Sequence, residues 1–149
     1  MLLDFGLLSK FAAEISALGD ADFHGETSLF IEDIINKNAD HKVFAAFHEE
    51  KAVGFLILST VLDEAEILEV AVSENLRRNG IGSELMTEVF GWCEKNGIAQ
   101  IFLEVRESNL PALNCYGKFG FVENGVRKNY YRNPSENAVL MSKKVSVVF

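Results

Sequence analysis

Three short apolar segments follow one another between residues 42 and 72 with only short charged links between them. They are KVFAAFHE, AVGFLILSTVL and AEILEVAV, and the links are Glu49-Glu50-Lys51 and the turn-like pair Asp63-Glu64. Runs of this length, apolar and partly β-branched, are typical of strands. Short links of this kind join antiparallel neighbours, so the region predicts a three-stranded antiparallel meander.

Helical periodicity appears on both sides of this meander. Apolar residues recur at helical spacing from Leu7 to Leu18, with Gly19 as the predicted stop, and again through residues 26–38, where Thr27 or Ser28 offers an N-cap. After the meander the same spacing returns over residues 83–95, and Asn96-Gly97 supplies a C-terminal stop.

The remaining third of the chain alternates again between strand and helix patterns. AQIFLEV and the later FVENGVRKNYY and AVLMSKKV predict strands, and LPALNCYGKFG predicts a short helix with Pro111 in its first turn and Gly120 as its cap. The order is helices, meander, helix, strand, helix, hairpin. We therefore expect one mixed α/β domain over residues 1–149, with a mostly antiparallel sheet flanked by helices.

Composition narrows the range of partners. The 149 residues are 48% hydrophobic, which suits one domain with a substantial core, and 14 Lys and Arg against 22 Asp and Glu give a net charge of −8. This balance argues against nonspecific nucleic-acid binding and favours a cationic partner, unless the charge serves solubility alone.

Cysteine, histidine and hydropathy patterns suggest no covalent or metal scaffold. Cys93 and Cys115 form no CxxC pair, and His24, His41 and His48 lack metal-ligand spacing. No apolar run approaches the roughly 18 residues of a membrane span. We expect a reduced cytoplasmic setting, with no metal, no membrane and no nucleic acid.

A glycine loop, Arg77-Arg78-Asn79-Gly80-Ile81-Gly82-Ser83, leads from the last meander strand into a helix. Unpaired N–H groups at the positive end of a helix favour an anion such as phosphate, and glycines let a ligand approach closely. The sequence has neither the Walker A Lys nor the third Rossmann glycine. A tight turn with a solvated basic pair is the alternative interpretation.

The loop resembles the Arg/Gln-x-x-Gly-x-Gly/Ala segment of the GCN5-related N-acetyltransferases (GNAT), and the predicted elements come in that family's order. IFLEVRESNLPALNCYGKFGF, VRKNYY and VLDEAEILEVAV are similar to segments of ribosomal-protein alanine N-acetyltransferases of the RimI type. The resemblance covers residues 50 to 142 well and the first 40 weakly. It implies the acyl-CoA N-acyltransferase fold, acetyl-CoA as co-substrate and a protein N-terminal amine as acceptor.

Two candidate catalytic residues follow from this resemblance. Acetyl transfer needs a base to deprotonate the amine and an acid to protonate the departing thiolate. Strand alternation turns Glu104 away from the aliphatic face of Ile101, Leu103 and Val105, and Glu104 matches the family's general base. Tyr116 corresponds to its general acid, although the residues alone allow a core aromatic with an exposed hydroxyl.

Glu69 and Cys115 leave alternatives open. Other acetyltransferases of the superfamily place a catalytic glutamate at the position of Glu69, which makes this residue a second candidate base, a wall of the acceptor pocket or a solvent-facing carboxylate. Cys115 adjoins Tyr116 and raises the option of an acetyl-cysteine intermediate. Nothing basic accompanies the thiol in sequence, so we expect direct transfer.

The resemblance also implies binding residues. The predicted cofactor-binding set is Val70, Ala71, Val72, Arg77, Arg78, Asn79, Gly80, Ile81, Gly82, Ser83 and Asn109. Asn109 is alternatively only the N-cap of the next helix. Tyr130 and Tyr131 are expected near the acceptor groove, and because adjacent strand residues point to opposite faces, we expect at most one of them to contact substrate.

Substrate identity depends on a loop where this chain departs from the pattern. Related sequences carry Pro-Trp between the first two helices, where this chain has Phe23-His24-Gly25-Glu26. The leading hypothesis is an Nα-acetyltransferase, active as a monomer or weak dimer, that modifies the N-terminal alanine of a basic small-subunit ribosomal protein. The alternatives are an acetyltransferase for a polyamine or aminoglycoside and a non-catalytic acyl-CoA-binding module.

Overall fold

A six-stranded sheet in the order β1-β2-β3-β4-β6-β5 forms the centre of the computed structural model, which describes residues 1–23, 31–34, 40–77, 79–132 and 134–146. The strands are β1 (His41–His48), β2 (Lys51–Val61), β3 (Glu64–Val72), β4 (Gln100–Arg106), β5 (Val122–Tyr131) and β6 (Glu136–Lys144). Only β3 and β4 run parallel. The predicted meander, the separate fourth strand and the closing hairpin are confirmed.

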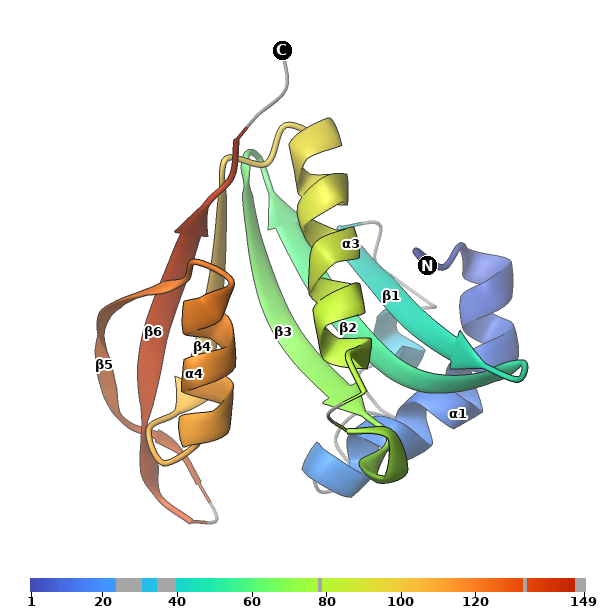
Figure 1. Cartoon of the computed structure of the whole chain (residues 1–149), viewed down its shortest axis with the longest axis horizontal. Helices are drawn as coiled ribbons and strands as arrows, with labels where there is room; N and C mark the ends of the chain where they lie inside the picture. Colours follow the sequence, from blue (N-terminus) through green and yellow to red (C-terminus); the bar gives the residue numbers. More distant parts are fainter. Residues whose placement is uncertain (24–30, 35–39, 78, 133, 147–149) are drawn as a thin grey trace.

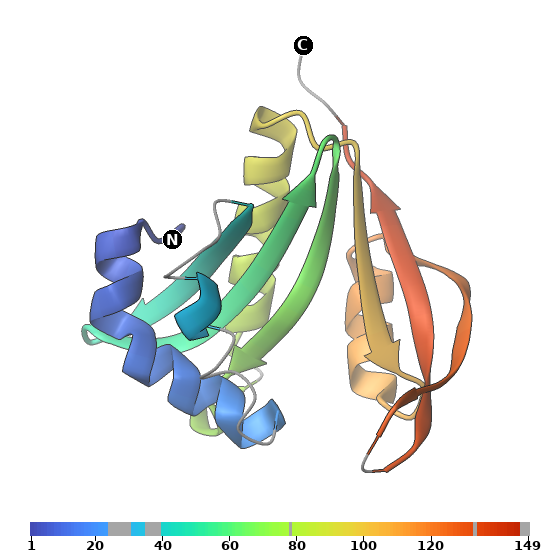
Figure 2. The ribbon, with the colours of Figure 1, turned by 180° about the vertical axis from the view of Figure 1, so that it is seen from behind.

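Helices cover the two faces of the sheet unequally. Helices α3 (Ile81–Lys95) and α4 (Leu110–Lys118) lie on the front face in Figure 1, and α1 (Phe5–Phe23) and the helical residues 31–34 lie behind β1, β2 and β3 (Figure 2). Behind β4, β6 and β5 the described part of the chain supplies no helix. One end of the rear face is therefore left open.

Each covered face has its own apolar core. Helix α3 buries Leu85, Met86, Val89 and Cys93 against the front of the sheet, and Ile15 of α1 packs into the rear core with the aliphatic side chains of β1 and β2. No helix among the described residues has the length and apolar character needed to cross a bilayer.

The helix boundaries test the predictions. Helix α3 ends at Lys95, with Asn96 as its C-cap and Gly97 following at φ +73°, as predicted. The predicted stop at Gly19 is wrong: α1 continues to Phe23 and Gly19 is buried within it, since a glycine inside a helix costs only about 1 kcal/mol. The helix begins earlier than expected because Asp4 accepts a hydrogen bond from the Leu7 N–H at 2.8 Å. The predicted caps Thr27 and Ser28 lie outside the described residues.

Gly54 of β2 couples the sheet to the start of α3. A Cβ at this position would stand 2.9 Å from Cγ2 of Ile81, the first residue of α3, and 3.4 Å from the Ala71 carbonyl oxygen. The β-branched Ile81 side chain has little rotamer freedom with which to give way. The absence of a side chain at Gly54 thus sets how closely the glycine loop approaches β3.

We predict that Gly54→Ala lowers the free energy of unfolding by about 1–3 kcal/mol, because the added methyl group overpacks this contact. Gly91→Ala is the matched control: it lies inside α3 with open space around its Cβ position, and the change should raise stability by about 0.5–1 kcal/mol. Urea unfolding followed by circular dichroism measures both. Equal or greater stability of the Gly54 variant would contradict the packing described.

Candidate active site

The ladder between β3 and β4 ends partway along both strands. Paired residues run from Glu64↔Gln100 to Ile67↔Leu103, and the two strands then diverge, as Figures 1 and 2 show. At the same point the register of β3 with β2 shifts by one residue, between Leu58↔Ile67 and Ile57↔Glu69. Leu68 is the extra residue of this bulge, and a bulge bends and twists its strand. The bulge therefore accounts for the divergence.

Beyond the bulge, the backbone groups of β3 alternate between β2 and the side that β4 has left. The Ser73 N–H donates to the Val53 carbonyl at 2.8 Å, and in an antiparallel pair every second residue is bonded in this way. Ala71, opposite Phe55, is therefore bonded to β2, whereas the peptide groups of Val70 and Val72 point toward the diverged strand. Of the three predicted cofactor contacts on β3, Ala71 has its N–H and C=O already used in the sheet.

The glycine loop lies directly after this segment. A short 3₁₀ turn, η1 (Glu74–Leu76), is followed by Gly80 at φ +80°, which is the N-cap of α3 and has no side chain to bond the first N–H groups of the helix. The N–H groups of Ile81, Gly82 and Ser83 have no carbonyl four residues back to bond. A Cβ at Gly82 would meet nothing within 4 Å. These groups form a cradle with room for a phosphate.

Basic and polar side chains hold the shape of this loop. Arg77 Nε donates to the Val72 carbonyl at 3.2 Å, and Asn79 Nδ2 donates to the Arg77 carbonyl at 3.3 Å. Arg77 thus ties the loop back to the end of β3. Arg78, the other predicted phosphate ligand, lies outside the described residues.

Glu104 is the first residue of β4 beyond the part of the strand that pairs with β3. Its side chain leaves the face of Leu103 and Val105, both buried, as predicted. The carboxylate is 18% exposed and lies 3.4 Å from Arg127 Nη1 of β5. A hydrogen bond with this carboxylate raises the pKa of Tyr130. Glu104 is therefore a partly buried acceptor on the open rear face of the sheet.

Tyr116 approaches from the opposite face. It lies on α4, packs against the front core and has its ring centroid 5.7 Å from that of Phe121. Burial, with smaller contributions from Cys115 and Tyr131, raises the pKa of Tyr116 to about 12. Its phenol is therefore protonated at neutral pH. Cys115 is exposed and Cys93 is buried.

The predicted orientation of Tyr130 and Tyr131 is wrong. Tyr130 and Tyr131 do not point to opposite faces, because their ring centroids are 5.1 Å apart. A hydrogen bond with Glu104 raises the pKa of Tyr130, and burial followed by the charge of Glu104 raises the pKa of Tyr131. The cause is a register shift between Arg127 and Tyr131, with Asn129 at φ +53°. The bulge breaks the alternation and brings both rings to Glu104.

No sequence pattern indicated the arginine that holds this hairpin in place. Arg106 of β4 donates to the carbonyls of Arg132 and Pro134, each at 3.1 Å, and forms an ion pair with Glu136 at 3.2 Å. Its guanidinium also lies 4.5 Å from the Tyr131 ring centroid. The position of Tyr131 beside Glu104 therefore depends on Arg106.

Glu69 lies across the divergence from Glu104, and Asn109 caps a helix. Val70 packs into the front core and Ala71 into the rear core, so Glu69 shares the rear face with Glu104, but on the far strand of the divergence. It is half-buried. Asn109 Oδ1 accepts a hydrogen bond from the Ala112 N–H at 3.2 Å, which confirms that Asn109 is the N-cap of α4.

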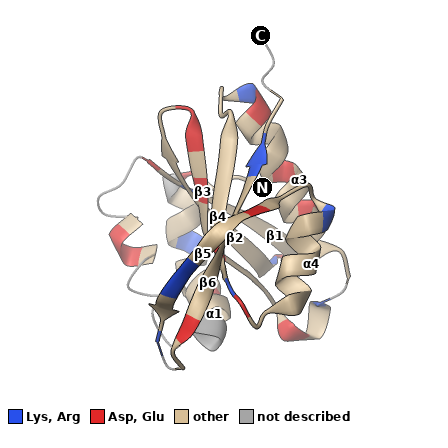
Figure 3. Ribbon diagram, turned by 90° about the vertical axis from the view of Figure 1, so that its left-hand side faces the viewer, with Lys and Arg blue, Asp and Glu red and all other residues tan. Residues whose placement is uncertain are grey.

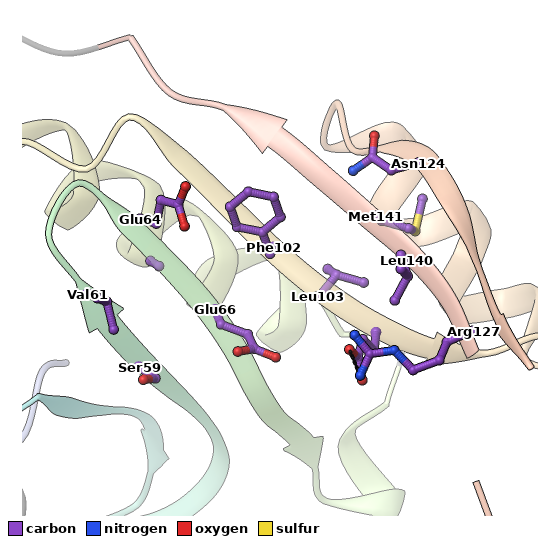
Figure 4. Close-up of a pocket in the computed structure, with 12 residues that line it drawn as sticks. Ser59, Val61, Glu64, Glu66, Phe102, Leu103, Asn124, Arg127, Leu140 and Met141 are labelled. Carbon is purple, nitrogen blue, oxygen red and sulfur yellow. Dashed lines mark ion pairs between the residues drawn. The ribbon is translucent and has the colours of Figure 1, made fainter. Parts of the chain in front are cut away.

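A cavity of about 430 Å³ opens on the rear face beside Glu104. Its floor includes Phe102 and Leu140, and Glu66 and Arg127 reach toward each other across it (Figure 4). Sequence reasoning did not find Glu66 or Arg127, although the parallel register puts Glu66 beside Phe102 and so on the face of Glu104. In the described part of the chain, no three His, Cys, Asp or Glu side chains gather in a way that would hold a metal ion.

Known proteins with the same arrangement identify the family. Residues 12–121 match the model of the acetyltransferase (GNAT) family. A [ribosomal protein bS18]-alanine N-acetyltransferase of Escherichia coli K12 is 34% identical over 114 residues, which are 75% of this chain and 77% of that protein. The crystal structure of the ribosomal-protein-S18-alanine N-acetyltransferase from Escherichia coli superimposes with a TM-score of 0.82 at 30% identity, covering 100% and 96% of the two chains.

A more distant structure shares the fold alone. An aminoglycoside 6'-N-acetyltransferase complexed with coenzyme A has a TM-score of 0.76 at 18% identity, covering 89% of each chain. Three findings support the same assignment: the divergence of β3 and β4, the glycine N-cap of α3, and the family match over most of the chain. The chain belongs to the GNAT family of N-acetyltransferases.

Proposed function

We propose that this enzyme transfers the acetyl group of acetyl-CoA to the α-amine of a protein N-terminus, the N-terminal alanine of a small-subunit ribosomal protein. The observation that carries the proposal is the divergence of β3 and β4 after Ile67↔Leu103, where Glu104 is the first residue of β4 beyond its pairing with β3. Tyr116 lies on α4 at the opposite face of the sheet. The 34% identical relative is a ribosomal-protein alanine N-acetyltransferase, and this supports the choice of acceptor.

The residues present fit acetyl-CoA as the donor. The N–H groups of Ile81, Gly82 and Ser83, with the positive end of α3, would bind the pyrophosphate. The peptide groups of Val70 and the N–H of Val72 would bond the pantetheine arm, since the Val72 carbonyl already accepts from Arg77. The bound thioester supplies an activated acyl group whose leaving group is a thiolate. Asn109 would contribute through the position of α4, because its side-chain oxygen already caps that helix.

Two proton transfers then frame the reaction. Glu104 accepts a proton from the acceptor's ammonium group, and the neutral amine forms a bond to the thioester carbonyl carbon. Tyr116 donates its phenolic proton as the carbon–sulfur bond breaks, so that CoA leaves as the thiol. The nitrogen loses its second proton as the amide forms, and this proton passes through solvent to the Tyr116 phenolate. Glu104 releases the first proton to solvent, and the products are the acetylated N-terminus and CoA. Cys115 takes no part in this direct transfer.

Purified enzyme assayed for CoA release against a panel of alanine-starting peptides and a panel of polyamines and aminoglycosides tests the acceptor class. Glu104→Gln should lower kcat for the best acceptor by about 10²- to 10⁴-fold, the usual contribution of a general base. Glu69→Gln, the matched carboxylate across the divergence, should leave kcat close to the wild-type value.

Three outcomes would contradict parts of this proposal. Turnover of the amines alone would replace the protein acceptor, and tight acetyl-CoA binding without turnover of either panel would make the chain a binding module. Loss of kcat in the Glu69 variant with an active Glu104 variant would move the general base to β3.

The pH dependence tests Tyr116. Because burial raises its pKa to about 12, the donor form persists through neutral and mildly alkaline pH, and kcat should not fall between pH 8 and pH 10. Tyr116→Phe should lower kcat by about 10²- to 10⁴-fold at every pH in this range. A decline of wild-type kcat below pH 10 that disappears in the phenylalanine variant would show that the phenol titrates much earlier.

A further inference from the structure

The cavity beside Glu104 is larger than an α-amine requires. It extends from Glu104 along the rear of β3 and β4 to Ser59 and Val61 of β2, with a volume of about 430 Å³. It therefore has room for a side chain of the acceptor in addition to its terminal amine.

The chemistry of the walls favours one class of side chain. Phe102 and Leu140 provide an apolar floor, and Glu66 stands at the rim with its side chain directed across the cavity (Figure 4). An aliphatic stem that ends in a positive charge suits both features, since Lys and Arg bury their stems along apolar surface and keep the charged head at a polar edge.

Charge within the cavity is not balanced. Arg127 forms an ion pair with Glu104 and stacks over the Tyr130 ring at 5.1 Å, whereas Glu66 forms no ion pair with any residue in the described part of the chain. Figure 3 shows a basic stretch in β5 and an acidic stretch in β3. Burial and the neighbouring charge of Glu104 raise the pKa of Glu66, and the charge of Arg127 offsets only part of this effect.

The register of the sheet determines how Glu66 is positioned relative to Glu104. Glu66 lies opposite Phe102, and Glu104 is two residues further along β4 on the same face, so the two carboxylates start from diagonal positions on one face of the sheet. Consecutive Cα atoms of an acceptor are about 3.8 Å apart. An amine held at Glu104 thus leaves the long side chain of the second residue within reach of Glu66.

We infer that Glu66 and this cavity form a specificity subsite that selects acceptors with Lys or Arg as the second residue. The inference rests on the proposed N-terminal acetyltransferase function. Glu66 acts on the binding of the acceptor and takes no part in proton transfer.

Steady-state kinetics with paired peptides test the subsite. One peptide carries Ala-Lys at its start and the other Ala-Gln, with identical residues afterwards, and each is assayed with wild type, Glu66→Gln and Glu123→Gln. Glu123 is an exposed carboxylate of β5 outside the cavity, so its variant matches the charge change. Thermal melts check that all three proteins are equally folded.

We expect wild type to prefer the Lys peptide by about five- to tenfold in kcat/KM, the range for a partly exposed to hydrogen-bonded charge pair. The preference should lie in KM, weaken at high salt and disappear in Glu66→Gln, with the Gln peptide unaffected. The Glu123 variant should keep it.

A Lys preference that survives in Glu66→Gln, or that falls equally in Glu123→Gln, would overturn the subsite and leave the proposed function standing. If wild type acetylates neither peptide but does acetylate a small amine, the proposed function fails and the subsite fails with it.

Discussion

The early end of the β3–β4 ladder is the constraint on which the rest of the structure depends. One extra residue in β3, Leu68, bends that strand away just after Ile67↔Leu103. Paired strands satisfy each other's backbone groups, so ending the ladder leaves the peptide groups of Val70 without a strand partner on the β4 side. Such groups need a partner, and we propose that acetyl-CoA provides it.

The front and rear faces of the sheet carry different parts of the proposed site. The front carries α3, with its glycine start, and α4, with Tyr116, whereas the rear beyond β3 has no helix in the described part of the chain and holds Glu104 and the cavity. Arg106 fastens the β5–β6 hairpin beside this cavity through Glu136 and two carbonyls. An acidic chain with a basic glycine loop is consistent with this division between a phosphate-binding side and a cation-binding side.

Local sequence patterns predicted the helices and strands well. They predicted less well which side chains come together across the sheet. Alternation in β4 predicted the face of Glu104, and the capping pattern identified Asn109, because both depend on neighbouring residues alone. The pairing of Tyr130 with Tyr131 could not be predicted, since a register shift at Asn129 overrides strand alternation. Nor does local sequence reveal which cation faces a carboxylate across the sheet. The missed residues are those whose role arises from strand pairing.

Amide hydrogen exchange of Val70, followed by NMR with and without acetyl-CoA, tests the central claim most directly. Ala71 is a built-in control because its N–H is already bonded within the β2–β3 pair. The account predicts that acetyl-CoA slows exchange at Val70 strongly and changes Ala71 little. Equal exchange at Val70 in the free and bound enzyme would mean that the open edge of β3 does not hold the cofactor, and the account would be wrong.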